Sequence, residues 1–198
     1  MPILSFSVPA MLPSVAMGVM AKGQLDFGDF AVDEFWSRIH DQSELSDDEN
    51  IYEYMDRTGR GHKTQTIRPY DYLNPNPRSW HSRIRPGDYC DIWWKQRAPK
   101  LAFKIGRVKL IAVHQVRIVR PDGRQWVKGY ISESRSSLEY LPKFQVGDGL
   151  DEDPFMDEMD SDQLIKLALA DGFKSIGEFR DYFTPKPGDE FRGNMLVW

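Results

Sequence analysis

Apolar and polar side chains follow two different spacings in the first part of the chain. Residues 3–8 alternate between the two kinds, which is the pattern of a β-strand with one buried face. Pro9 suits the first turn of a helix, and Gly23 suits the end of one. Between them, apolar side chains recur at helical spacing, at Met11, Leu12, Val15, Ala16, Val19 and Met20. The pattern predicts a strand followed directly by an amphipathic helix.

Three stretches lack a regular pattern. Residues 24–60 lose the helical period, although residues 29–39 could form a short helix that buries Phe30, Phe35, Trp36 and Ile39. Residues 41–50 are acidic and polar, which predicts a mobile loop. Residues 132–150 are expected to be irregular, and the acidic run 151–162 is expected to be a solvated loop.

β-branched and aromatic side chains return in the middle and at the end of the chain. They predict strands over residues 89–96, 103–119 and 190–198. The second of these segments is long enough for one curved strand or for two. Residues 121–123 (Pro-Asp-Gly) are a hairpin signal, which would return the chain along a partner strand at residues 125–131.

Two helices are predicted near the C-terminus. Asp160 or Ser161 can cap the first helix, and Gly172 can end it. Ser175 and Glu178 have the spacing of a capping box for the second helix. Its expected buried face consists of Ile176, Phe179 and Phe183.

The composition is that of one globular domain. The chain has 198 residues, of which 40% are hydrophobic, so it is long enough to bury a sizeable core. The single cysteine, Cys90, excludes an internal disulfide framework and fits a reducing compartment, and we expect it to be a buried structural thiol. No segment has the length of a membrane helix, and no basic stretch precedes the apolar N-terminal residues. We therefore expect a cytoplasmic protein with no membrane partner, or one in the host cytoplasm if the source is viral.

Charge is unevenly distributed along the chain, although the net charge is only −4. Residues 1–59 hold 3 basic and 11 acidic side chains, residues 60–143 hold 18 and 6, and residues 144–198 hold 5 and 13. A basic middle segment in an acidic protein indicates an anion-binding surface. The alternative is that the basic strands pair with acidic helices of the same domain.

The most distinctive stretch is residues 59–68, in which two glycines precede Lys63, Thr66 and Arg68. A lysine whose pKa is lowered can act as a base, and a threonine hydroxyl needs such a base to become a nucleophile. In a regular strand Thr66 and Arg68 would share one face and Lys63 would lie on the other. Lys63 and Thr66 can therefore converge only if the chain turns near Lys63. The alternative is an ordinary edge strand with solvated basic side chains.

The segment that follows, residues 69–86, contains four prolines and predicts a long loop. Aromatic rings alternate with arginines in it, the combination that stacks nucleic-acid bases and binds phosphates. A basic surface loop without such a role is the alternative. The binding residues expected here and in the next strand are Arg78, Trp80, Arg83, Arg85, Trp93, Lys95 and Arg97.

Residues 61–68 (Gly-His-Lys-Thr-Gln-Thr-Ile-Arg) resemble the Gly-x-Lys-x-x-Glu-x-Arg signature of ASCH domains, a family with a PUA-like fold. Thr66 stands where most of the family has glutamate. The same threonine occurs in the motif of one branch, the small bacterial N4-acetylcytidine amidohydrolases. Further segments resemble the family in the same order: the strand and helix at 3–20, the Pro-Gly-Asp turn at 86–88, the Asp-Gly-Phe segment at 171–173 and the closing strand at 194–198.

The resemblance implies an α+β fold, in which a small PUA-like β-barrel of about five to six strands is flanked by helices. The single domain would span residues 1–198, with insertions near 21–58 and 132–158. The first insertion ends at the motif. It would be either a lid over the site or an added structural segment that takes no part in the site.

By the same resemblance, the protein would be a metal-independent amidohydrolase, without a cofactor, that removes an acyl group from N4 of a cytosine nucleoside. Lys63 and Thr66 would be catalytic, and the branch's catalytic glutamate would fall on Asp171. Arg68 would bind substrate or stabilise negative charge.

The alternative that the resemblance leaves open is an RNA-binding module, or an RNA-cleaving one, without deacylase activity. Its partner would be single-stranded RNA rather than a modified nucleoside, and the basic and aromatic residues named above would hold the strand.

Overall fold

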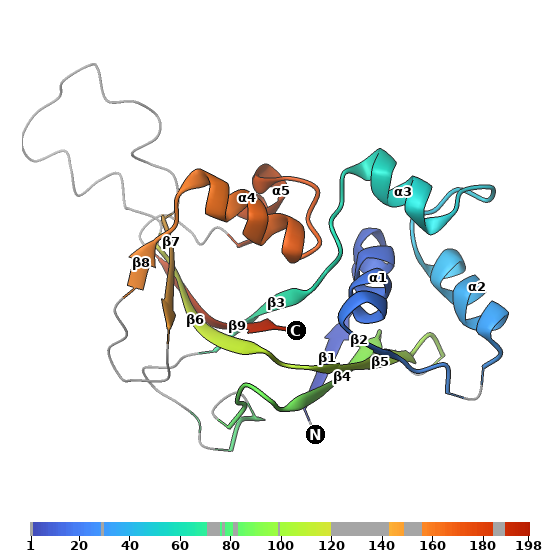
Figure 1. The fold of residues 1–198 in the computed structure, drawn as a ribbon, viewed down its shortest axis with the longest axis horizontal. Coiled ribbons are helices and arrows are strands. Elements are labelled where there is room, and N and C mark those ends of the chain that lie inside the picture. The colour runs from blue at the N-terminus through green and yellow to red at the C-terminus, as the bar shows by residue number, and fades with distance from the viewer. Residues whose placement is uncertain are drawn as a thin grey trace, which may run out of the picture.

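The structure is a computed structural model that describes residues 2–28, 30–70, 76, 78–80, 83–98, 100–119, 143–148, 156–183 and 189–198. These residues have an α+β fold with two sheets, as expected from the sequence (Figure 1). None of the described helices combines the length and the apolar character needed to cross a bilayer.

The first sheet has four strands in the order β1 (Ile3–Phe6), β4 (Tyr89–Trp94), β5 (Phe103–Lys109) and β2 (Gly23–Leu25). β1 runs parallel to β4, and the other neighbours are antiparallel. Trp94 is fully buried, whereas Trp93 on the opposite face is half-buried, because neighbouring strand residues face opposite ways. Cys90 is buried, and burial is the main cause that raises its pKa to about 12, so it is a structural thiol as expected.

The second sheet has five antiparallel strands in the order β3 (Gln65–Pro69), β9 (Glu190–Val197), β6 (Ala112–Val119), β7 (Lys143–Asp148) and β8 (Met156–Glu158). Only Leu110 and Ile111 separate β5 from β6, so the chain bends there from one sheet into the other. Of the two alternatives for residues 103–119, one curved strand or two strands, the structure has two strands.

The expected barrel of about five to six strands is not found in the described part of the chain. Nine described strands form two separate sheets, and neither sheet closes on itself. The edge strands β1 and β2 of one sheet, and β3 and β8 of the other, have only one described neighbour each. The α+β class is therefore established, whereas barrel closure is not.

The predicted first helix is present as a short 3₁₀ turn, η1 (Pro9–Met11), followed by α1 (Leu12–Lys22). α1 packs on the first sheet, and its other side is covered by α2 (Val32–Gln42) and α3 (Ile51–Thr58). Both of these helices belong to the 21–58 segment, which is therefore largely regular rather than aperiodic. Of the four side chains predicted to be buried here, Phe35 and Ile39 are buried, and Phe30 and Trp36 are half-buried.

Residues 41–50 were expected to be a mobile loop, but hydrogen bonds join this connection to the two helices. Glu49 pairs with Arg57, and Ser46 bonds to both His40 and Glu49.

α4 (Ser161–Ala170) and α5 (Ile176–Phe183) cover the second sheet. Asp160 caps α4 through a reciprocal capping box with Gln163, as one of the two predicted residues. The second core lies beneath these helices and includes Leu164, Leu167, Val116, Ile118, Phe179 and Phe183.

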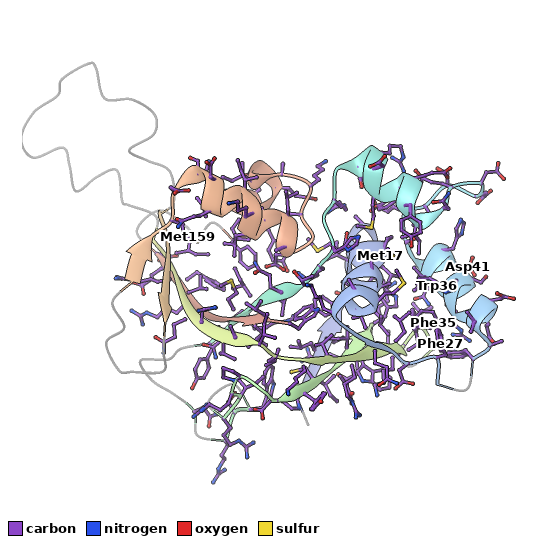
Figure 2. The ribbon with its side chains drawn as sticks, in the orientation of Figure 1. Met17, Phe27, Phe35, Trp36, Asp41 and Met159 are labelled. Atoms are coloured by element: carbon purple, nitrogen blue, oxygen red, sulfur yellow. The ribbon has the colours of Figure 1, made fainter. Side chains whose placement is uncertain are left out.

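A first core lies between the first sheet, α1 and α2, and Figure 2 labels residues at the outer ends of the two cores. Phe27, Phe35 and Trp36 gather beside α2, whereas Met159 lies at the opposite end of the molecule. The Phe27 and Phe35 rings meet edge to face, with centroids 5.0 Å apart.

Two expectations for the second insertion are wrong. Residues 143–148, expected to be irregular, form β7, and part of the acidic run forms β8. β7 pairs with β6 and β8 pairs with β7, and local periodicity does not reveal such pairing. The hairpin expected at 121–123 and the strand at 125–131 lie outside the described residues.

Candidate active site

Residues 61–64 lie between α1 and α4, just before β3 begins. The Lys63 N–H donates to Ser14 O at 2.9 Å, and the Thr64 N–H donates to Ala170 O at 2.8 Å. The passage is tight, because a Cβ atom placed on Gly18 of α1 would lie 1.8 Å from Lys63 O. Lys63 is thus outside the regular strand, so the alternation of β3 does not separate it from Thr66. Both side chains line the same cavity.

Lys63 and Asp171 form a buried ion pair, with the two residues 2% and 1% exposed. The Lys63 Nζ contacts Asp171 Oδ1 and also donates to the backbone O of Asp171. Asp171 caps the C-terminus of α4, where the helix dipole disfavours a negative charge. The ammonium of Lys63 would offset that cost, which explains why an aspartate is tolerated there. None of the described residues donates a hydrogen bond to Asp171 Oδ2, which is also buried.

Burial, and then the positive charge of Arg68, lower the pKa of Lys63 well below its ordinary value of 10.5. Contact with the Asp171 carboxylate acts in the opposite direction. We take the lowered pKa as the net result, because removing an ammonium from water costs several kcal/mol even in a paired site.

Phe6 lies between the two cations of the site. Its ring centroid is 5.4 Å from Lys63 Nζ and 4.8 Å from Arg68 Cζ. Arg68 is further held by Ser5 O, to which Nη2 donates at 3.0 Å. Burial is also the main cause that lowers the pKa of Arg68, but an arginine keeps its charge in proteins. Arg68 is therefore a fixed positive charge beside a lysine that can release its proton.

The cavity that holds these groups has a volume of about 80 Å³. Lys63, Thr66, Arg68 and Asp171 supply its charged or reactive groups, and the remaining lining is mostly apolar. The other residues that line it are Ser5, Phe6, Ser7, Val8, Met11, Ile67, Phe173, Tyr182 and Phe183. Sites for small molecules usually have volumes of about 300–1,000 Å³, so this cavity has room only for a small group.

A second cavity of about 520 Å³ adjoins the first, since both are lined by Ser5, Ser7 and Arg68. Four of the predicted binding residues gather here: Arg68, Trp80, Lys95 and Arg97. Lys95 has a positive φ of 42°, a strained conformation for a side chain other than glycine. Its N–H donates to Phe6 O at 2.8 Å, which fixes the turn after β4 against β1.

The other predicted binding residues are not brought together. Arg78, Arg83 and Arg85 are exposed, and none of them is among the described residues that line the two cavities. Trp93 is half-buried on β4 and also lines neither cavity. Part of the 69–86 loop, residues 71–75, 77, 81 and 82, lies outside the described residues.

No described residue of the 21–58 segment lines either cavity. In this structure the first insertion packs on α1 and is not a lid over the candidate site.

Several residues of the site were not predicted. Ser5, Phe6 and Ser7 come from the first strand and the residue after it, and Tyr182 comes from α5. The alternating pattern at residues 3–8 identified a strand, but nothing in it indicated which polar positions face the motif.

Arg60 is a further unpredicted residue, three positions before Lys63. Its Nη1 donates to Gly172 O at 2.9 Å, and its Nη2 pairs with Glu178 at 2.8 Å. These bonds hold the turn that follows Asp171. The arginine between the two glycines of the motif was the signal in the sequence.

Within the described residues, no three His, Cys, Asp or Glu side chains converge in a way that could hold a metal ion. No protein-family model, no curated protein and no solved structure matches this chain.

Proposed function

We propose that this protein is an amidohydrolase that removes a small acyl group from N4 of a cytosine nucleoside, and that it is an ASCH domain with a PUA-like core. One observation carries the proposal. The three catalytic residues that the family resemblance implies, Lys63, Thr66 and Asp171, line one small cavity although Asp171 is 108 residues from Lys63 in the chain.

The chemistry follows from the charges of these groups. The neutral amine of Lys63 takes the proton of the attacking hydroxyl, which belongs either to Thr66 or to a water molecule. As the oxygen bonds to the acyl carbon, the carbonyl electron pair moves to its oxygen, where Arg68 stabilises the charge. Asp171 stabilises the new Lys63 ammonium, which returns the proton to N4 as the C–N4 bond breaks. If Thr66 attacks, a water molecule then hydrolyses the acyl-threonine.

The sizes of the two cavities support a substrate with a small acyl group. About 80 Å³, with apolar walls that include Phe6 and Phe173, suits an acetyl group but not a base. The base and sugar would occupy the adjoining cavity of about 520 Å³, where Trp80 offers an aromatic surface.

The test is a chromatographic assay of N4-acetylcytidine incubated with the protein. We expect conversion to cytidine and acetate, and we expect Lys63→Met to abolish it. That substitution leaves Asp171 buried without its partner, which costs about 3–5 kcal/mol, so folding is checked by circular dichroism. Thr66→Val removes only a hydroxyl and distinguishes the two nucleophiles: its activity is lost if Thr66 attacks and persists if water attacks.

Thr64→Val is the matched control, because Thr64 lies two residues away and does not line the cavity. It should retain full activity. No conversion by the wild-type protein, or undiminished activity in folded Lys63→Met, would refute the amidohydrolase.

The second candidate function is binding of single-stranded RNA. It is favoured by one observation, the gathering of Arg68, Lys95 and Arg97 around a cavity that Trp80 also lines. Guanidinium and ammonium groups bind phosphates, and an indole stacks on a base. Tight RNA binding by a protein that does not convert N4-acetylcytidine would favour this function over the first.

A further inference from the structure

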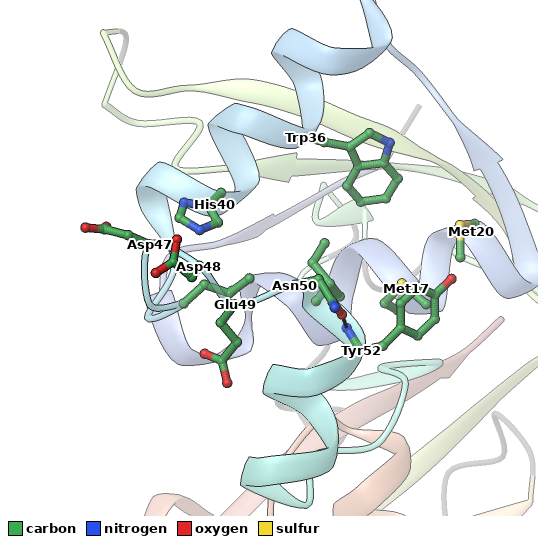
Figure 3. Close-up of a pocket in the computed structure, with 11 residues that line it drawn as sticks. Met17, Met20, Trp36, His40, Asp47, Asp48, Glu49, Asn50 and Tyr52 are labelled. Atoms are coloured by element: carbon green, nitrogen blue, oxygen red, sulfur yellow. Dashed lines mark hydrogen bonds between the residues drawn. The ribbon is translucent and has the colours of Figure 1, made fainter.

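A third cavity, of about 600 Å³, lies between α1, α2, α3 and the connection from α2 to α3 (Figure 3). Its volume is that of a site for a small molecule. It shares no described lining residue with the two cavities of the candidate active site. The lining consists of Met17, Met20, Trp36, His40, Leu45, Asp47, Asp48, Glu49, Asn50, Ile51 and Tyr52.

Apolar groups form the deep part of this cavity. Met17 is 2% exposed and lies at its base, and Trp36 and Ile51 are half-buried. Two large side chains that proteins usually cover, Met20 and Tyr52, are instead 41% and 66% exposed. Exposed apolar side chains that surround a concave site indicate a ligand with an apolar part.

Negative charge lies at one end of the cavity. Figure 3 shows Asp47, Asp48 and Glu49 on one side and Trp36 and Met20 on the other. Glu49 is already paired with Arg57, at 2.6 Å. Asp47 and Asp48 are exposed, and no basic side chain in the described part of the chain pairs with either carboxylate. The cavity therefore has two carboxylates without a described basic partner at one end and an aromatic and thioether surface at the other.

The N-terminus of α3 does not provide an anion-binding site in this cavity. The N–H groups of Tyr52 and Glu53 both donate to Asn50 Oδ1, at 3.0 and 3.1 Å. The Asn50 N–H in turn donates to Glu53 Oε2. This capping box uses the donors that a helix N-terminus would otherwise present to an anion, so the local charge is set by the aspartates.

We propose that this cavity binds a small organic cation with an apolar body. The apolar body packs against Met17, Trp36 and Tyr52, and the cationic group lies at Asp47 and Asp48. The site shares no described lining residue with the proposed active site, and its carboxylates disfavour an anionic nucleic acid.

The test uses three soluble probes of nearly the same shape: phenethylammonium, phenethyl alcohol and phenylacetate. Binding is followed through the indole N–H resonance of Trp36 in ¹⁵N–¹H spectra of the whole protein, assigned with Trp36→Phe. We expect saturable binding of the cation, binding of the alcohol that is about three- to tenfold weaker, and no binding of the anion.

The Asp47→Asn/Asp48→Asn variant should bind the cation about three- to tenfold more weakly than the wild type does. Its affinity for the alcohol should be unchanged. Asp33→Asn/Asp56→Asn is the matched control. It makes the same change in net charge at two exposed helix residues that do not line the cavity, and it should bind the cation like the wild type.

Three results would overturn the proposal. The first is that the cation causes no saturable shift of the Trp36 resonance at millimolar concentration. The second is that the alcohol and the cation bind with equal affinity. The third is that the two double variants lose cation affinity equally. Because these readouts are independent of deacylation, they remain valid whichever function the active site has.

Discussion

Lys63 is subject to opposing electrostatic effects. Burial and the nearby Arg68 disfavour its ammonium form, whereas the Asp171 carboxylate and the C-terminal end of α4 favour it. The lowered pKa means that the first pair of effects is the stronger. A lysine with a lowered pKa is unprotonated at a lower pH than an exposed lysine, so it can act as a base where an exposed lysine does so poorly.

The pH dependence of activity tests this balance. The amine acts as a base only when it is unprotonated, so kcat/KM on N4-acetylcytidine should rise with pH through the folded-state pKa of Lys63. The midpoint should lie well below 10.5, the ordinary value. A pH–rate profile whose rising limb is centred near 10.5 would show that Lys63 is not the base.

The same pKa shift determines a change in stability. Between the lowered folded-state pKa and 10.5, the unfolded chain binds more protons at Lys63 than the folded chain does. The free energy of unfolding therefore gains a contribution that increases with pH across this window. Denaturant unfolding at several pH values measures this increase with pH. We expect the increase in Thr66→Val, which keeps Lys63, and not in Lys63→Met.

At the scale of elements, the site depends on a close approach of a helix and a loop. Glycine in the middle of a helix costs about 0.5–1 kcal/mol relative to alanine. α1 nevertheless has Gly18 at its centre, buried against the backbone of Lys63. The close passage of the motif over α1 accounts for this glycine, since any side chain would collide with Lys63 O.

Gly18→Ala should therefore destabilise the protein although alanine is the better helix former. We expect a loss of about 1–3 kcal/mol from overpacking, which exceeds the gain in helix propensity. Displacing the Lys63 backbone should also reduce deacylation by at least about tenfold.

Gly177→Ala in α5 is the matched control, because the nearest atom to its new Cβ would be Ser175 Oγ at 3.6 Å, an ordinary contact. Its stability should be unchanged or slightly increased. Equal effects of the two substitutions in thermal unfolding would contradict this explanation.

Elements whose signals are local were predictable, and elements that depend on distant pairing were not. The strand at residues 3–6 and helices α1, α4 and α5 followed from periodicity and capping residues. α3 was missed because only Tyr54 and Met55 in its eight residues are buried, too few for a visible period. The two-sheet arrangement depends on pairings such as β1 with β4 and β3 with β9, which no local pattern encodes.

The candidate site was also predictable only where its residues share one local motif. Lys63, Thr66 and Arg68 belong to one motif, so the sequence could propose them together. Asp171 came only from the family resemblance, since a carboxylate at a helix C-terminus is a weak candidate by itself. Tyr182 and the serines of the N-terminal segment reach the site through folding alone.

At the scale of the whole molecule, binding surfaces of opposite charge lie on different parts of the fold. The cavity lined by Lys95 and Arg97 is basic, and the cavity between α1, α2 and α3 is acidic. The sequence shows the same division, with a basic middle segment and an acidic N-terminal one. This division of charge would favour an anionic ligand at the basic cavity over the acidic one.

The second candidate function makes a quantitative prediction at this scale. If single-stranded RNA binds at the basic cavity, Lys95→Gln/Arg97→Gln should weaken binding of every oligonucleotide alike. It should also make the slope of log K against log salt concentration shallower by about 1.4, or 0.7 for each lost phosphate contact. Fluorescence anisotropy over a salt series measures both quantities.

Lys100→Gln/Lys174→Gln is the control for this experiment, since both lysines are exposed and neither lines the cavity. A slope that changes equally in the two double variants would mean that RNA responds to net charge alone.

The Lys63–Asp171 pair also has a consequence for how the protein matures. The two residues are 108 positions apart, and β3 is completed only by β9 at the end of the chain. Contacts of such long sequence separation are costly in loop entropy and favour slow assembly. A nascent chain that has not yet reached residue 171 carries an ordinary solvated lysine, protonated and unreactive at neutral pH. On the proposed function, Lys63 therefore becomes a base only when the native contacts form, so the rate at which deacylase activity appears during refolding should measure completion of the native topology.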